Sequence, residues 1–200
     1  HDLATLMIIV SDNTATDLVF GLVGKDYLGS TIDELGLART RIPMTTRELL
    51  YSICGLDPAN PEHTYAEATA RLRERRLVPD ADGFSGEKSD VSSPADMTRL
   101  LAKVHTGEVL TESSREAVLD ILKRQQLNNV IPLLLPTGTV TAHKTGSYKG
   151  VRCDVGIVYG PSGPYTVAIM AMNVEGNSLE IDLSLAKVSK AIYDEFNPPN

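Results

Sequence analysis

Apolar positions recur at two different spacings, and they divide the chain into a helical first part and a later part rich in strands. Residues 1–10 are mostly apolar and predict the last turns of a buried helix. Helical spacing then returns in a series of segments: residues 14–22, 30–35, 45–54, 64–77, 94–105 and 113–124. The chain is therefore expected to be mainly helical until it nears residue 136.

Polar residues stand where several of these helices are expected to begin. Asp12 or Asn13 is the expected N-cap of one helix and Ser30 that of another, because such side chains accept hydrogen bonds from the first backbone N–H groups. Ser113 or Ser114 is expected to cap the last helix of the series in the same way.

After residue 136 the pattern changes to runs rich in Val, Ile, Thr and Tyr. These runs predict strands at residues 139–148, 151–159 and 165–174. Because only short turns separate them, the strands should pair as an antiparallel meander. A final helix at residues 178–196 shows an apolar face made of Ile181, Leu185, Val188 and Ile192. The expected fold class is α+β, an antiparallel sheet flanked by helices, and further strands are expected upstream of this chain.

Composition and charge narrow the class of protein further. The 200 residues, 42% of them hydrophobic, suit one domain or one domain with an insertion. No apolar run approaches the roughly 20 residues that span a bilayer. The net charge of −7 disfavours a nucleic-acid partner, since no basic field would attract phosphates. Cys54 and Cys153 are interpreted as buried free thiols, with a disulfide as the alternative.

Two polar clusters stand out against this background. The tripeptide Ser11-Asp12-Asn13 directly follows the first apolar run, where it could simply mark a helix boundary. The second cluster, beginning with Lys144 and Thr145, lies within the first predicted strand. Taken alone, neither cluster indicates a function.

Taken together, the clusters contain groups that acyl transfer requires. Gly146 has no side chain, so a substrate could approach the strand edge and pair with it. The backbone N–H of Ser147 could face a developing oxyanion. Lys144 and Thr145 offer an ammonium and a hydroxyl to a carboxylate.

In sequence order, Ser11-Asp12-Asn13 and Lys144-Thr145-Gly146 correspond to two of the three motifs of the penicillin-recognising serine hydrolases. The helix start at residues 92–97 and the strands around 153–159 and 165–170 fit the same pattern. The chain thus resembles the C-terminal portion of a class A-type serine β-lactamase, a relative of the penicillin-binding proteins.

The resemblance implies roles for individual residues. Ser11 would move a proton and Asn13 would bind the substrate's amide carbonyl, with Asp12 in a structural role. Lys144 and Thr145 would anchor the carboxylate of a β-lactam. Ser147 would complete the oxyanion hole, beside Gly146 in the substrate-binding strand. The catalytic set is therefore expected to be Ser11, Lys144 and Ser147, without metal or cofactor.

The chain departs from the family pattern in its nucleophile motif. Ser-x-x-Lys sequences begin at Ser85 and Ser184, but both follow Ser11 and are interpreted as chance matches. We expect the nucleophile in an upstream segment, so that the chain by itself is inactive and its domain, residues 1–200, is N-terminally truncated.

The segment that should carry the deacylation machinery also departs from the pattern. Residues 11–90 are longer than the family allows, which predicts a helical or loop insertion within about 45–90. A glutamate that activates the deacylating water is not identified, and Glu48 is the nearest candidate, with Glu62 and Glu67 also available.

Three functions stay open at this point. The first is a β-lactamase-like hydrolase, the second a penicillin-binding or D,D-peptidase-like enzyme, and the third a binding module without catalysis. The expected partner is a small molecule, either a β-lactam or a peptidoglycan-like peptide. A homodimer or a companion polypeptide carrying the N-terminal portion is also expected, to cover the sheet. The resemblance implies an extracytoplasmic location, periplasmic or secreted.

Overall fold

The computed structural model describes residues 1–198 and divides the chain into two compact units. Unit 1 comprises His1–Ser11 and the chain from Ser93 onward, and unit 2 comprises Asp12–Ser92. The predicted insertion within 45–90 lies inside unit 2 and stays a prediction.

Unit 1 is organised around a three-stranded antiparallel sheet in the order β1-β2-β3. The strands are β1 (Val140–Tyr148), β2 (Val151–Gly160) and β3 (Gly163–Met172). Tyr148 pairs with Val151 across the first hairpin, and Gly150 adopts the positive φ of 74° that this tight turn requires. The predicted antiparallel meander is confirmed.

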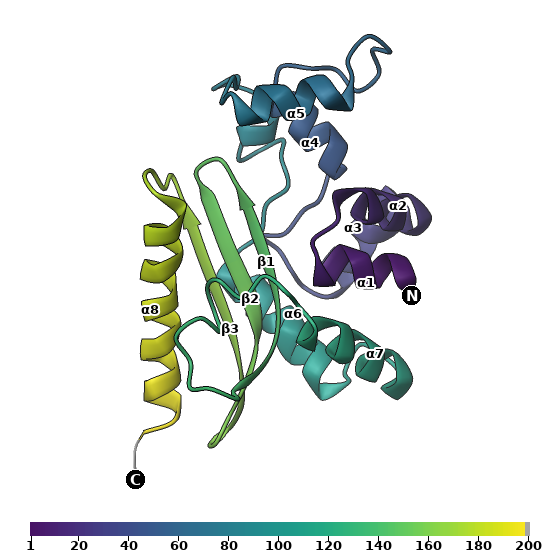
Figure 1. Ribbon diagram of the computed structural model, residues 1–200. Coiled ribbons are helices and arrows are strands. Elements are labelled where there is room, and N and C mark those ends of the chain that lie inside the picture. The colour runs from purple at the N-terminus through teal and green to yellow at the C-terminus, as the bar shows by residue number, and fades with distance from the viewer. Residues whose placement is uncertain (199–200) are drawn as a thin grey trace. The chain divides into compact units, whose positions relative to one another are not determined.

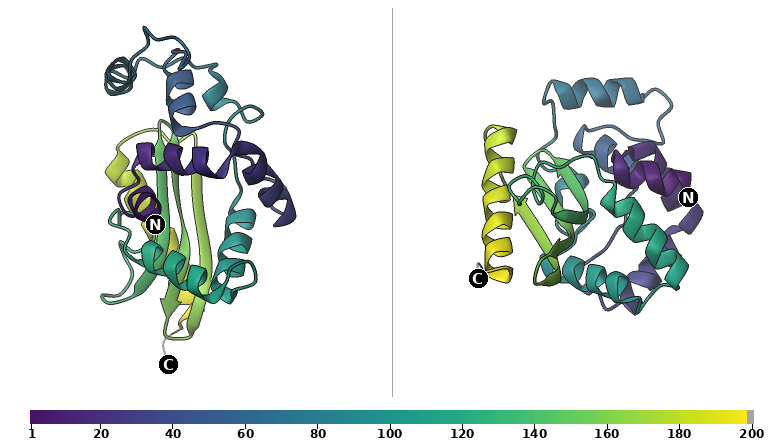
Figure 2. Two further views of the ribbon diagram at one scale, coloured as in Figure 1. Left: turned by 90° about the vertical axis from the view of Figure 1, so that its right-hand side faces the viewer. Right: turned by 60° about the horizontal axis from the view of Figure 1, so that its bottom comes forward.

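Helices cover both faces of this sheet. Helix α8 (Ser178–Phe196) lies along one face, and α6 (Pro94–Thr106) and α7 (Glu112–Lys123) lie on the other, as Figures 1 and 2 show. Unit 1 also contains the short first helix, α1 (Asp2–Ile9). The α+β class, an antiparallel sheet flanked by helices, is confirmed.

Each face of the sheet has its own hydrophobic core, because alternate strand residues point to opposite sides. Val158, Val167 and Ile169 pack with Tyr193 of α8 on one face. Ala142 and Ile157 on the other face pack with side chains of α6 and α7, namely Leu101, Leu119 and Leu122. Full burial of such a side chain stabilises the fold by roughly 1.5–3 kcal/mol, so the sheet and its helices form a fixed frame for the strand ends.

Unit 2 is helical and is held together by carboxylates at helix ends. Its helices are α2 (Asn13–Val23), α3 (Lys25–Glu34), α4 (Thr46–Ile53), α5 (Tyr65–Arg73) and the 3₁₀ helix η1 (Asp82–Phe84). Asp17 of α2 accepts hydrogen bonds from the backbone N–H groups of Thr46 and Arg47, at 2.7 and 2.9 Å. A carboxylate at this N-terminus also complements the helix dipole, so α2 and α4 are tied together.

Several expectations about helix ends are wrong. Helix α3 begins after Gly24, so Ser30 lies inside it and donates to the carbonyl of Tyr27 instead of capping. Helix α7 is capped by Thr111, whose hydroxyl accepts from the backbone N–H of Ser114; neither Ser113 nor Ser114 is the cap. Ser30 lies beyond the first turn of α3, where the N–H groups already have helical partners. The hydroxyls of Ser113 and Ser114, in the first turn of α7, bond to Thr111 Oγ1.

Two burial expectations also need correction. Residues 2–9 do form α1, but Ile9 is the only one of them that is buried, and Leu6 is 48% exposed. In α8, Val188 is 48% exposed, and the buried face runs through Ala186, Ser189 and Tyr193. The bounds of α8 itself match the expectation.

Cys54 and Cys153 are both free, as expected; Cys54 is buried and Cys153 only partly so. Among the helices of residues 1–198, none combines the length and apolar character that a membrane span requires.

Candidate active site

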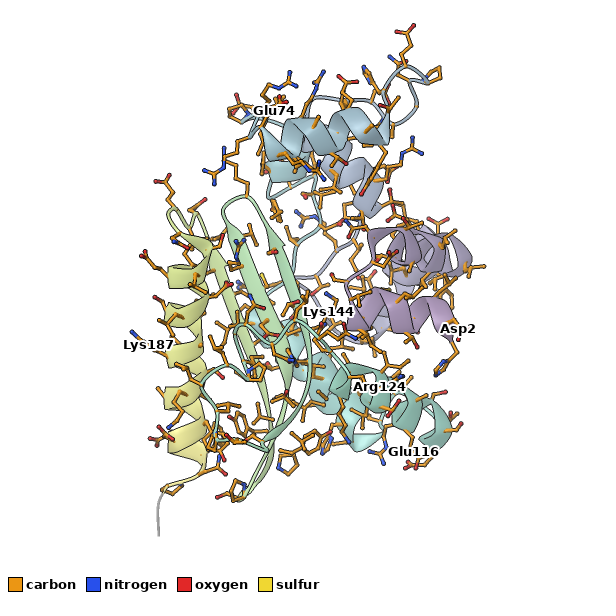
Figure 3. All side chains as sticks on the ribbon, in the orientation of Figure 1. Asp2, Glu74, Glu116, Arg124, Lys144 and Lys187 are labelled. Atoms are coloured by element: carbon orange, nitrogen blue, oxygen red, sulfur yellow. The ribbon has the colours of Figure 1, made fainter. Side chains whose placement is uncertain are left out.

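The strand β1 brings Lys144 into contact with Ser11 at the other end of the sequence. Lys144 Nζ donates a hydrogen bond to Ser11 Oγ at 2.8 Å, although the two residues are 133 positions apart. Nζ also donates to the carbonyl oxygen of Thr145. Figure 3 labels Lys144 on its strand. Ser11 and Lys144, one residue from each polar cluster, are thus in direct contact within unit 1.

The backbone of Ser11 is held in an uncommon conformation. Its φ is +57°, in the left-handed region that residues other than glycine rarely adopt. Such conformations cost of order 1–3 kcal/mol and persist where the surroundings fix them. At Ser11, α1 ends directly before it and Asp12 caps α2 directly after it. Within unit 1, the Ser11 hydroxyl is held by the hydrogen bond from Lys144 Nζ.

Burial changes the acidity of Lys144. The side chain is partly buried, and loss of solvation lowers its pKa below the ordinary lysine value, while the Asp154 carboxylate raises it in part. Burial thus makes the charged form of Lys144 less favourable than it is for a lysine in water.

A cavity of about 500 Å³ opens beside the end of β1. Thr145, Gly146 and Ser147 form one wall, and the loop segment from Gln126 to Val130 forms the other. This volume lies in the range of small-molecule sites. Three of the residues expected from the sequence to bind substrate or oxyanion therefore line one cavity.

Arg152 is a cavity residue that sequence reasoning missed. It lines the cavity and pairs with Ser147 across the β1–β2 hairpin. Its guanidinium donates to Ser178 Oγ at 2.8 Å and lies 3.4 Å from a carboxylate oxygen of Asp182. The tight turn at Lys149-Gly150 contained the signal, because it forces residue 152 to lie opposite residue 147.

Lys144 and Thr145 were expected to anchor a substrate carboxylate, and this stays a prediction. The Lys144 ammonium contacts Ser11 and does not belong to the cavity lining, whereas Thr145 and Arg152 do.

Asp12 and Asn13 belong to unit 2. The Asp12 carboxylate accepts from the backbone N–H of Ala15 at 2.6 Å, and its carbonyl accepts from Thr16 Oγ1, so Asp12 is the N-cap of α2. Asn13 is the first residue of that helix, and its side chain is exposed. Its expected role in binding an amide carbonyl stays a prediction.

The two Ser-x-x-Lys matches do not form nucleophile sites. Ser85 Oγ accepts from the backbone N–H groups of Glu87 and Lys88, and the Lys88 ammonium pairs with Asp82 at 2.9 Å. Ser184 Oγ donates to the carbonyl of Glu180 within α8. Neither hydroxyl faces its lysine, as an activated serine would have to do.

The candidate glutamates for deacylation have local structural roles. Glu48 completes the capping box of α4, where its carboxylate accepts from the backbone N–H of Thr45 at 2.7 Å. Glu67 pairs with Arg71 at 2.5 Å, and Glu62 is exposed.

Within the described part of the chain, His, Cys, Asp and Glu side chains nowhere gather in a group of three or more that could hold a metal ion. The chemistry that the site offers rests on hydroxyl, ammonium, guanidinium and backbone N–H groups.

Fold and site together define a β-lactamase-type arrangement: a helix-covered antiparallel sheet whose edge strand carries Lys-Thr-Gly beside the serine of Ser-Asp-Asn. The model of the β-lactamase enzyme family matches residues 1–196. The chain therefore belongs to the β-lactamase enzyme family.

Individual relatives agree with this assignment. The chain is 29% identical to Beta-lactamase 3 of Bacillus cereus over 177 residues, which cover 86% of this chain and 56% of that protein. It is 32% identical to Beta-lactamase L2 of Stenotrophomonas maltophilia over 123 residues, 61% of this chain and 30% of that protein. The chain thus spans little more than half the length of the first relative.

Solved structures show the same fold. The β-lactamase of Sphaerobacter thermophilus superposes with a TM-score of 0.74 at 25% identity, covering 99% of this chain and 64% of the other. The structure of PBP-A gives a TM-score of 0.66 at 28% identity, covering 96% and 60%.

Proposed function

We propose that this chain supplies part of the active site of a serine hydrolase that opens the β-lactam amide through an acyl-enzyme. The observation that carries the proposal is the hydrogen bond from Lys144 Nζ to Ser11 Oγ, beside a cavity lined by Thr145, Gly146 and Ser147. The nucleophilic serine belongs to a segment outside this chain. Family membership supports the reaction class.

Ser11 delivers the proton that the leaving nitrogen needs. Because Lys144 donates to Ser11 Oγ, the hydroxyl's lone pair is occupied and its own proton points away from the ammonium. When the C–N bond of the amide breaks, Ser11 gives this proton to the nitrogen and recovers one from the attacking serine. The ammonium stabilises the negative charge that develops on Ser11 Oγ during the transfer.

The cavity binds the substrate. The hydroxyl of Thr145 takes the substrate carboxylate, and Arg152, whose N–H groups already bond to Ser178, Asp182 and backbone carbonyls, attracts it with its positive charge. The exposed Gly146 lets the substrate lie against β1, and the backbone N–H of Ser147 takes the oxyanion. Asn13 takes the amide carbonyl of the substrate's side chain.

A D,D-peptidase-like enzyme is the second candidate. It is favoured by the local engagement of Glu48 and Glu67, which leaves the deacylating water without an evident base, and by the likeness to PBP-A. Both candidates act on substrates found outside the cytoplasm, so we propose an extracytoplasmic location for either.

The experiment is incubation of the full-length natural protein with benzylpenicillin, followed by intact-mass spectrometry and product analysis. Release of penicilloate identifies a β-lactam hydrolase, and a lasting adduct identifies the peptidase-like enzyme. Reversible binding without adduct or product would overturn the catalytic proposal and leave a binding module.

A further inference from the structure

A buried histidine and aspartate lie directly behind the active-site strand. His143 is 1% exposed and Asp154 is fully buried, and His143 Nδ1 donates to Asp154 Oδ1 at 2.9 Å. His143 precedes Lys144 on β1, so the two side chains point to opposite faces of the sheet. None of the steps proposed above uses this pair.

The two strands approach each other closely at His143. Gly156 is the strand partner of His143, and a Cβ at Gly156 would lie 2.6 Å from the Cβ of His143 and 2.9 Å from the carbonyl oxygen of Ala142. Any other residue at 156 would have to push the backbone of β1 away from β2. The glycine therefore fixes where β1 carries His143.

His143 contacts the wall of the cavity, and Asp154 contacts the residue that follows it. Asp154 Oδ2 accepts from the backbone N–H of Ile131 at 2.8 Å. His143 Nε2 lies 3.0 Å from Asn128 Oδ1, and Asn128 lines the cavity opposite Thr145. Ser189 of α8 adds a hydrogen bond to the Ile131 carbonyl at 2.9 Å. The wall is thus attached to the sheet through buried polar groups.

The protonation of His143 follows from its partners. One ring nitrogen faces a carboxylate oxygen and the other faces an amide oxygen, and both of these are acceptors. With the Asn128 oxygen turned toward the ring, as in this structure, both contacts call for an N–H donor, and the imidazolium is the form that has two. The buried charge of Asp154 is then paired, as a buried carboxylate requires.

We propose that His143 is a positioning residue: as an imidazolium bonded to Asp154 and Asn128, it fixes the end of the cavity wall, residues 128–130, in the arrangement that receives the substrate. Its effect on substrate rests on the proposed function, whereas its protonation and contacts do not. His143 acts through Asn128 and touches no reacting atom.

The first test is nitrogen-15 NMR of the full-length natural protein at pH 7. Both ring nitrogens of His143 should carry a proton, and burial should slow the exchange of these protons with water. The variant Asn129→Leu is the control, because Asn129 lines the same wall but donates to Asp182 instead of contacting His143. It should leave both His143 signals in place. A His143 ring with one unprotonated nitrogen would overturn the proposal.

A matched pair of variants tests the direction of the contact with Asn128. In Asn128→Asp the new carboxylate can still accept from Nε2–H, so the melting temperature should stay within about 2 °C of the wild type. In Asn128→Leu the acceptor is lost, and a fall of roughly 3 °C is expected. If Asn128→Asp lowered the melting temperature as much as Asn128→Leu does, the Asn128 side chain would be the donor and the proposal would be wrong.

Kinetics with benzylpenicillin test the positioning. Asn128→Leu should raise KM about tenfold and change kcat by less than about twofold, because the wall binds substrate and does not take part in bond breaking. An unchanged KM would mean that the contacts among His143, Asp154 and Asn128 only stabilise the fold, and it would overturn the proposal. If the wild type did not react with benzylpenicillin at all, the proposed function would fail, while the NMR signals and melting temperatures would still decide the state of His143.

Discussion

Lys144 and Ser11 are joined by a hydrogen bond of 2.8 Å that closes a loop of 133 residues. Lys144 lies on β1, and Ser11 directly follows the end of α1; both belong to unit 1. The contact therefore joins two positions that the fold holds independently, which is the preorganisation that electrostatic catalysis requires.

Replacing Lys144 tests the importance of this contact. In the full-length natural protein, Lys144→Ala should reduce acylation by a penicillin, with a loss of transition-state stabilisation of about 2–4 kcal/mol, as for other preorganised groups. The measurement is kcat/KM for acylation by stopped flow. Lys149→Ala, at an exposed lysine of the same hairpin, is the control and should react like the wild type. Unchanged acylation in Lys144→Ala would remove this lysine from the site.

The strained backbone of Ser11 predicts a conflict between stability and activity. Ser11→Gly and Ser11→Ala both lose the hydroxyl, so both should lose acylation. Only glycine relieves the positive φ of 57°, so Ser11→Gly should be more stable than Ser11→Ala by about 1 kcal/mol. Urea denaturation of the two variants gives this difference directly. Equal stabilities would mean that the conformation of Ser11 costs little.

Sequence patterns predicted the sheet and the last helix because their signals are local. Alternating apolar residues and a Lys149-Gly150 turn are enough to define the β1–β2 hairpin. Ser30 led to a wrong prediction for the start of α3. A serine caps a helix only where no helical turn precedes it, and α3 already begins at Lys25. The intrinsic helix propensities of the residues do not reveal this earlier start, since tertiary packing decides where a helix begins.

The site was predicted only in part, because some of its residues come together only in the folded structure. The motif residues of β1 were found because they are adjacent in sequence. Arg152 was overlooked because its relation to Ser147 exists only across the hairpin. The His143–Asp154 pair was overlooked because burial of both groups depends on α8 and on the absence of a side chain at Gly156. Neither the position of Arg152 nor the burial of this pair can be predicted from the spacing of apolar residues along the chain.

Asp90 should make unit 2 sensitive to pH. Burial raises the pKa of Asp90 to about 6; the backbone N–H of Met44 and the charge of Lys25 oppose the shift, and Glu48 and Asp17 add to it. The folded state thus holds the Asp90 proton more tightly than the unfolded chain, whose aspartates titrate near 3.9. The stability that Asp90 contributes is therefore full below about pH 4 and is lost as pH rises through about 6.

The variant Asp90→Asn should remove this loss, because its amide oxygen still accepts from Met44 N–H but carries no charge. Relative to wild type, the variant should gain about 1 kcal/mol in unfolding free energy between pH 4 and pH 7, a modest value because the carboxyl is only partly buried. Urea denaturation at both pH values measures it. Asp80→Asn, an exposed aspartate near the same loop, is the control. A gain of equal size in both variants would contradict the assignment to Asp90.

The 200-residue chain alone should not be acylated by a β-lactam. Ser85 and Ser184 both bond to nearby backbone groups, and Ser11 accepts a hydrogen bond from an ammonium, which is not a base. Mass spectrometry after incubation with benzylpenicillin should show the unmodified mass. A stoichiometric adduct on any serine of residues 1–198 would require a nucleophile within this chain.

Turnover of the acyl-enzyme should be slow. Fast deacylation in class A enzymes depends on a glutamate that activates water. Of the three candidates here, two are bound elsewhere and the third, Glu62, is exposed to solvent. Glu48 is bound in the capping box of α4, and Glu67 is paired with Arg71. Freeing Glu48 would cost the cap, about 1 kcal/mol of helix stability, so Glu48 is not expected to serve as the base.

With a chromogenic cephalosporin, the full-length natural protein should therefore give a burst of product equal to the enzyme concentration. A steady state below about 1 s⁻¹ should follow, at the low end of enzyme rates. Glu48→Gln should lower the melting temperature and leave the steady-state rate unchanged, and Glu67→Gln should behave alike as its control. A linear trace at on the order of tens of turnovers per second, abolished by Glu48→Gln alone, would instead show that the capping glutamate is the general base.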